Sequence, residues 1–177
     1  MGKQETPLPF LFMVDFIHFL IPMIDKKTLI DLAEAYLQDS PNYLVDVLVG
    51  SGNVITIEID NDEGVDINDC AALSQHLESI LDRDTEDFEL TVTSVGLTSP
   101  FKTPRQYRKH EGEEVEVLNK KGVKLTGILE SSDNEGFTLS ITKKVKPEGA
   151  KRKVEVTDRV RYMFDEVKYT KYLIRFK

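Results

Sequence analysis

Apolar residues recur with helical spacing in two stretches near the N-terminal end of the chain. From Asp25 onward they stand at Leu29, Leu32, Ala33, Tyr36 and Leu37, and in the second stretch at Ile67, Cys70, Leu73, Leu77, Ile80 and Leu81. A stripe with this period predicts an amphipathic helix with one face on a core. The first helix should end at Ser40-Pro41-Asn42. Asp66 should cap the second, with Asp69 in its first turn, because anions suit the positive end of a helix.

Three stretches alternate between apolar and polar residues, which predicts strands. They are residues 43–49, 54–59 and 88–93. The first two flank Gly50-Ser51-Gly52-Asn53, so we expect them to form a hairpin. The order helix-strand-strand-helix-strand predicts a three-stranded sheet with two helices on one face.

The chain beyond Gly112 is predicted to be nearly all strand. Short alternating runs begin near Val115, Val123, Phe137, Val154 and Val167. About five short strands in about 65 residues indicate a small SH3-like or Sm-like β-barrel, which makes the whole chain α+β. A glycine, Gly127, stands where the second of these strands should bend. Ahead of the barrel, Thr103 and Pro104 are typical of the N-cap and first residue of a short helix.

Charge divides the chain in two. Residues 1–95 carry four Lys/Arg against nineteen Asp/Glu, a net −15, and residues 96–177 carry nineteen against twelve, a net +7. Opposite signs suggest two surfaces with different partners. We therefore predict an α/β domain at 24–95, a linker at 96–102 and the barrel at 103–177.

Residues 1–23 form an apolar extension outside this scheme. The run Pro9–Met23 is shorter than the roughly 20 residues of a membrane-spanning helix, and Asp15 and His18 interrupt it. Two interpretations stay open. Either translation starts at Met23, or the segment is an apolar arm that binds an interface or a partner.

No catalytic or metal-binding pattern is found. One cysteine and three scattered histidines exclude a disulfide framework and give no zinc-ligand spacing. The acidic loop at 60–66 lacks the spacing of a calcium-binding EF-hand, and the turn Gly50–Gly52 has no neighbouring cation, unlike the basic loop of a KH domain. We expect a protein that is not an enzyme and has no metal or cofactor.

Two groups of cations are candidates for binding RNA phosphates. The first lies on the short helix: Lys102, Arg105, Arg108 and Lys109. The second flanks the turn at 147–149: Lys143, Lys144, Lys146, Lys151, Arg152 and Lys153. Cations on phosphates release counterions and so favour binding. Each group has an alternative interpretation: a solvated helix for the first, and lysines that protect an edge strand for the second. The acidic residues near Asp60 and Asp62 could dock a basic protein, or form a solvated loop and a helix cap.

The stretch from Thr93 to Val117 resembles the bacterial ribosome maturation factor RimP family. The matching residues are Gly96-Leu97-Thr98-Ser99-Pro100, Thr103-Pro104, Tyr107, Gly112, Val115 and Val117. The helix start at 65–70 matches as well, and the likeness covers about residues 24–177. The family commonly has Pro before the Gly and an Asp-Arg pair after the Leu, where this chain has Val95, Thr98 and Ser99. The interdomain hinge Gly96–Pro100 therefore lacks that charged pair.

The resemblance implies a cytoplasmic, monomeric, non-catalytic factor for assembly of the small (30S) ribosomal subunit. It implies contacts with ribosomal RNA and with a basic small-subunit ribosomal protein near the decoding region, and no membrane. The alternative is an Sm-like or SH3-like regulatory RNA-binding protein with no ribosome role.

Overall fold

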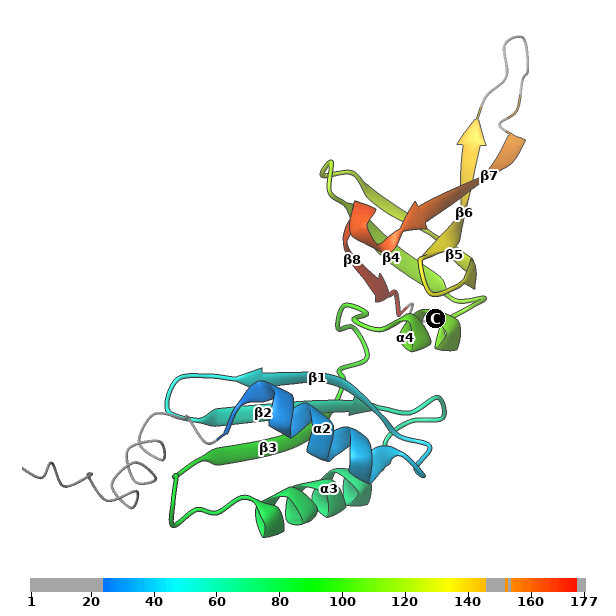
Figure 1. The fold of residues 1–177 in the computed structure, drawn as a ribbon. Coiled ribbons are helices and arrows are strands. Elements are labelled where there is room, and N and C mark those ends of the chain that lie inside the picture. Colours follow the sequence, from blue (N-terminus) through cyan, green and yellow to red (C-terminus); the bar gives the residue numbers. More distant parts are fainter. Residues whose placement is uncertain (1–23, 146–151, 153, 175–177) are drawn as a thin grey trace, which may run out of the picture.

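The computed structural model describes residues 24–145, 152 and 154–174, so the apolar extension lies outside the described residues. The N-terminal domain follows the predicted order of elements: α2 (Lys26–Leu37), β1 (Tyr43–Val49), β2 (Val54–Asp60), α3 (Ile67–Ile80) and β3 (Glu89–Ser94). Strand β2 is central, antiparallel to β1 and parallel to β3. Both helices lie on one face of this sheet, as predicted (Figure 1).

Aspartates begin both helices. The Asp25 carboxylate accepts hydrogen bonds from the backbone N–H groups of Lys27 and Thr28, and that of Asp66 accepts one from Asn68 N at 2.7 Å. These bonds satisfy amide groups that have no partner inside the first turn of a helix. The predicted cap at Asp66 is confirmed.

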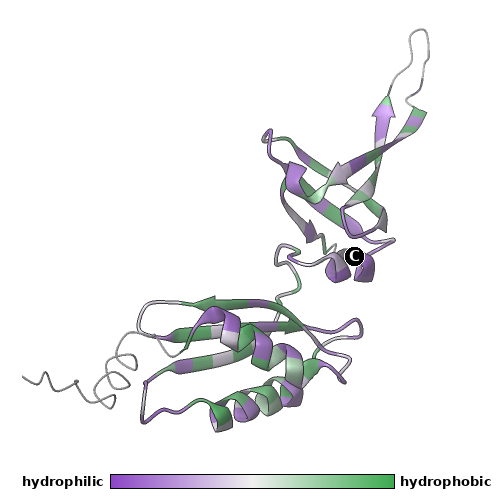
Figure 2. Cartoon of the chain, in the orientation of Figure 1, coloured by the Kyte–Doolittle hydropathy of each residue, from purple (hydrophilic) through white to green (hydrophobic). Residues whose placement is uncertain are grey.

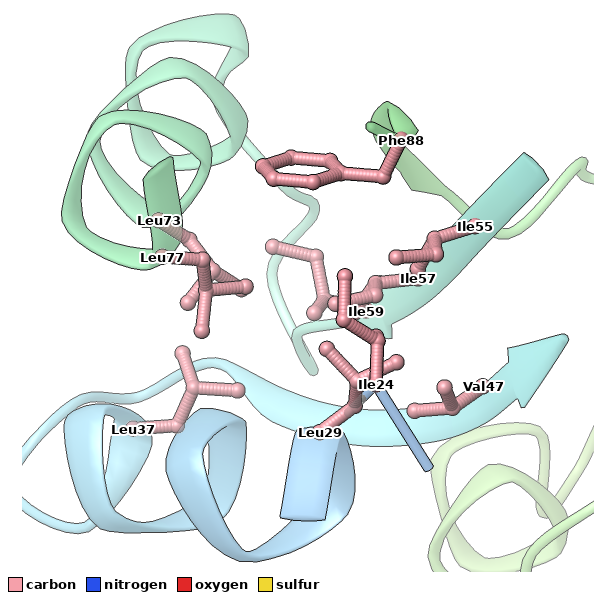
Figure 3. Close-up of a cluster of buried hydrophobic side chains, with 10 residues drawn as sticks. All are labelled: Ile24, Leu29, Leu37, Val47, Ile55, Ile57, Ile59, Leu73, Leu77 and Phe88. Atoms are coloured by element: carbon pink, nitrogen blue, oxygen red, sulfur yellow. The ribbon is translucent and has the colours of Figure 1, made fainter. Parts of the chain in front are cut away.

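The core of this domain fills the space between the helices and the sheet (Figure 3). Its buried members are Ile24, Leu29, Leu37, Val47, Ile55, Ile57, Ile59, Leu73, Leu77 and Phe88. The predicted apolar stripe of α3 is wrong at its two ends, where Ile67 is 82% exposed and Ile80 is 48% exposed. They are the first and last residues of α3, and only Leu73 and Leu77, near its middle, are fully buried.

The C-terminal domain consists of a short helix and one antiparallel sheet. Its elements are α4 (Pro104–Lys109), β4 (Glu114–Asn119), β5 (Lys124–Ser132), β6 (Gly136–Val145), β7 (Val154–Met163), a 3-10 turn η1 (Phe164–Glu166) and β8 (Val167–Tyr172). The strand order is β7-β6-β5-β4-β8, so the last strand returns to pair with the first. This arrangement agrees with the predicted small barrel.

Two features shape the barrel core. Tyr107 of α4 packs with Phe137 and the other buried apolar residues, which ties the helix to the sheet. At Gly127 of β5, a side chain would collide with the carbonyl oxygen of Ser140 on β6. Glycine is therefore required here by the close approach of the neighbouring strand.

Strands β6 and β7 continue beyond the rest of the sheet. The last pair between β5 and β6 is Ile128 with Ser140, whereas β6 and β7 stay paired as far as Val145 and Val154. Figure 1 shows this two-stranded arm projecting away from the N-terminal domain. In Figure 2 hydrophobic and hydrophilic residues alternate along the arm, although residues 142–145 and 154–159 are all exposed.

Candidate nucleic-acid interface

Helix α4 lies between the two sheets, and local hydrogen bonds fix its start. Thr103 caps it, Pro104 is its first residue, and Gln106 completes a capping box. The Gln106 side chain is 2% exposed and accepts a hydrogen bond from Lys102 N at 2.8 Å. Because Tyr107 is held in the barrel core, the orientation of α4 is set, and its basic residues meet the N-terminal domain.

Lys102 joins two carboxylates of the N-terminal sheet. Its Nζ lies 2.8 Å from Asp46 Oδ2 and 2.7 Å from Glu58 Oε2. Asp46 and Glu58 are directly opposite on β1 and β2, an arrangement that would be repulsive without a cation. Burial alone would raise the pKa of Asp46, but hydrogen bonds from Lys102 and Lys26 outweigh it and lower that pKa.

Arg105 binds the loop after β2. Its guanidinium donates to the Asp62 carboxylate from Nη2 at 2.8 Å and from Nε at 3.2 Å, and to the Pro41 carbonyl at 3.3 Å. The same group lies 4.2 Å from the centre of the Tyr43 ring, a cation–π contact. The hydrogen bond to Asp62 raises the pKa of Arg105.

Lys109 forms the most buried ion pair of this interface. Its Nζ lies 2.8 Å from Asp60 Oδ1 and 2.7 Å from the carbonyl oxygen of Asn61. The other Asp60 oxygen accepts from Gln106 at 3.2 Å and from the Tyr43 hydroxyl at 3.1 Å. Burial would raise the pKa of Asp60, yet the hydrogen bonds from Lys109, the Asn61 amide and Gln106 lower it.

Arg108 differs from Lys102, Arg105 and Lys109 in its partners. It is exposed and forms no ion pair among the residues that the structure describes; its guanidinium donates to the Asn134 side chain at 3.4 Å. Of the four cations predicted to bind RNA on this helix, Lys102, Arg105 and Lys109 thus hold carboxylates of the same chain.

Sequence reasoning missed these carboxylate partners. Asp46, Glu58 and Tyr43 were predicted only as positions in two alternating strands. One signal was present: two acids opposite each other in the predicted hairpin require a cation nearby. Nothing local says that the cation is Lys102, because it follows 56 residues after Asp46 and 44 after Glu58.

Two of the second group of predicted cations, Lys143 and Lys144, lie on β6 in the arm. Lys143 pairs with Asp158 at 3.6 Å and Lys144 with Glu155 at 3.5 Å, with all four side chains more than half exposed. Such pairs contribute little to stability, so a phosphate can replace the carboxylate at low cost. Arg152 is also exposed, while Lys146, Lys151 and Lys153 lie outside the described residues.

Comparisons with known proteins decide the family. Residues 32–98 match the RimP N-terminal domain. A ribosome maturation factor RimP of Porphyromonas gingivalis is 42% identical over 146 residues, which is 82% of this chain and 96% of the relative. That of Christiangramia forsetii is 34% identical over 85% of this chain and 99% of the relative. The ribosome maturation factor RimP of Flavobacterium psychrophilum is 34% identical over 64% of this chain and 74% of the relative.

The chain belongs to the RimP family. The predicted resemblance is confirmed, and with it a role in ribosome maturation. None of these matches favours the alternative of a regulatory Sm-like protein.

The predicted hinge of this RimP chain, residues 96–100, carries no charged side chain. On one side Val95 N donates to Ile59 O at 3.1 Å and continues the N-terminal sheet. On the other, Pro100 bridges to Lys171 of β8. Between them, Ser99 N closes a turn on the Gly96 carbonyl at 2.9 Å, and Leu97 is 75% exposed. The ionic contacts that join the domains come from Lys102, just before α4, and from Arg105 and Lys109 on it. The segment 96–100 itself carries Thr98 and Ser99 where the family commonly has a charged pair.

Among the described residues of this RimP chain, no group of three or more His, Cys, Asp or Glu side chains is placed to hold a metal ion. Within the same residues, none of the helices has the length and apolar content needed to cross a bilayer. His110 is stacked between Phe101 and Tyr172, at ring distances of 4.8 and 5.1 Å, and burial followed by the Lys109 charge lowers its pKa. Cys70 packs against the core, and burial raises the pKa of its thiol.

Proposed function

We propose that this RimP-family protein matures the small (30S) ribosomal subunit by binding its precursor, without catalysing a reaction. The observation that carries the proposal is the 42% identity to a ribosome maturation factor along 96% of that relative. The ion pairs described above favour a binding role over a catalytic one, because Lys102, Arg105 and Lys109 are each held by carboxylates of the same chain.

RNA contacts are proposed for the arm of β6 and β7. Lys143, Lys144 and Arg152 are exposed there, and Lys146, Lys151 and Lys153 belong to the same basic segment of sequence. A two-stranded ribbon is marginally stable in water by itself. Exposed cations on a projecting ribbon favour a role in which the arm lies along an RNA backbone and is stabilised by it.

A narrower role is proposed for the basic residues of α4 and for Lys102, which precedes it. Lys102, Arg105 and Lys109 would chiefly fix the two domains relative to each other, which sets the spacing of the surfaces that the precursor meets. We keep residues 96–102 as the proposed linker and 24–95 and 103–177 as the proposed domains.

The remaining partners are inferred from charge. The N-terminal part carries a net −15, which suits a basic ribosomal protein of the small subunit. We propose that the protein works as a monomer in the cytoplasm.

Sucrose-gradient profiles of cells that lack the gene test the proposal. We expect fewer mature small subunits, an excess of free large subunits and immature small-subunit RNA. A normal profile with fully processed RNA would overturn the assembly role.

Binding of the purified protein to small subunits tests the arm. The double variant K143Q/K144Q should bind more weakly, and its affinity should depend on salt less steeply by about two in the log–log slope. The matched control K120Q/K121Q removes two cations from the turn between β4 and β5 and should keep the wild-type slope. Equal slopes for the two variants would remove the arm from the interface.

A further inference from the structure

A cationic hollow lies beside α4, at the junction of the two domains. Its lining residues are Arg105, Arg108, Lys109 and Asp62, and its volume is about 370 Å³. Three cations face one carboxylate, so the lining has a formal charge of +2. Pockets of about 300 Å³ and above are large enough for small ligands.

The three cations differ in how far they are already satisfied. Lys109 is held by Asp60 and the Asn61 carbonyl, and Arg105 is held by Asp62. Arg108 donates only to the uncharged Asn134 side chain, at 3.4 Å, among the described residues. Most of the five N–H donors of its guanidinium therefore face the hollow or solvent. A guanidinium fork matches two oxygens of a phosphate.

We infer that this hollow binds a phosphate group of an RNA backbone, with Arg108 as its main ligand. Arg105 and Lys109 supply the surrounding positive potential while keeping their carboxylate partners. That the phosphate belongs to RNA rests on the proposed function; that the hollow accepts a phosphate rests on its lining alone.

The lining of the hollow comes from both domains. Asp62 comes from the N-terminal domain and the three cations come from α4, so the complete lining exists only while the domains are docked.

Pyrophosphate titrated into the purified protein tests the phosphate site without the ribosome. Binding followed by backbone amide shifts should move residues of α4 and the loop at 61–64. R108Q should weaken binding about tenfold, the loss of one charge-assisted contact. R108K keeps the positive charge but lacks the guanidinium fork, so its affinity for pyrophosphate should lie between those of the wild type and R108Q. The control K168Q removes an exposed cation of β8 and should bind like the wild type.

Small-subunit binding supplies the second test. R108Q should reduce the log–log salt slope by about one, and K168Q should not. Unchanged pyrophosphate affinity in R108Q, or equal losses in R108Q and K168Q, would overturn the inference and leave the proposed function standing. A wild-type protein that binds pyrophosphate at α4 but no small subunits would instead overturn the proposed function.

Discussion

Asp60 and Lys109 form an ion pair of 2.8 Å between the end of the N-terminal sheet and the helix that opens the barrel. Asp60 is 8% exposed, and its second oxygen is held by Gln106 and Tyr43. A buried carboxylate with several donors is costly to neutralise, because its partners lose their charged acceptor. This pair is the most buried of the ion pairs that join the domains among the described residues.

Asp60→Asn should lower the free energy of unfolding by about 2 kcal/mol, since it removes a charged acceptor that Lys109 and Gln106 use inside the interface. Urea unfolding followed by tyrosine fluorescence measures the change. Asp62→Asn is the matched control, because the Asp62 side chain is 52% exposed. It should change stability by no more than about 0.5 kcal/mol. Equal effects would show that burial does not distinguish the two pairs.

Lys102→Gln should leave Asp46 and Glu58 opposed without their shared cation, and stability should fall by about 1 kcal/mol. A double-mutant cycle with Glu58→Gln is the measurement. Because Glu58→Gln removes the repulsion that Lys102→Gln exposes, the double variant should be more stable than the sum of the single losses predicts. Strict additivity would mean that Lys102 does not bridge the two carboxylates in solution.

His110 should make stability depend on pH near neutrality. Its folded pKa lies below the usual 6.5, because burial, together with Lys109, disfavours its charge more than Asp60 and Glu113 favour it. As the pH falls, His110 therefore takes up a proton at higher pH in the unfolded chain than in the folded one. The free energy of unfolding is unaffected by this group above a pH of about 6.5 and decreases progressively below it.

Urea unfolding at pH 7.5 and 5.5 measures the loss. Replacing His110 by Phe should keep the stack with Phe101 and Tyr172 and shrink the difference between the two pH values. His76→Gln serves as the control and should retain the wild-type difference. A His110→Phe variant with the full pH dependence would contradict the assignment.

Gly127→Ala should destabilise the barrel by about 2 kcal/mol or more, because the added methyl group meets the Ser140 carbonyl, which the strand pairing holds in place. Thermal unfolding by circular dichroism measures the loss. Gly50→Ala is the comparison: its nearest neighbour would be the Val54 carbonyl oxygen, at an ordinary 3.5 Å. If both variants melt at the same temperature, the close approach of the Ser140 carbonyl is not the reason that glycine is needed at position 127.

Local signals in the sequence predicted the elements well. Thr103 and Pro104 predicted the start of α4, and the alternation around Val115 and Val117 predicted β4, because caps and periodicity act within a few residues. Ile67 and Ile80 were misplaced because an apolar residue at a helix end fits the same period whether or not a core lies beneath it.

The contacts at the domain junction could not be predicted in the same way. Lys109 and Asp60 are 49 residues apart, and Arg105 and Asp62 are 43 apart. The residues next to a lysine or arginine do not show whether it binds RNA or a distant carboxylate of its own chain. Only the arrangement of the two sheets distinguishes Arg108 from its neighbours.

The hinge also determines how strong these contacts need to be. Val95 is bonded to the N-terminal sheet and Pro100 is bridged to the C-terminal sheet, so residues 96–99 form the tether between the two sheets. A tether of this length spans at most about 14 Å. A short tether holds two surfaces at a high effective concentration, of millimolar order, so that docking becomes an intramolecular step. Ion pairs too weak to join two separate proteins can then keep the domains of this one together.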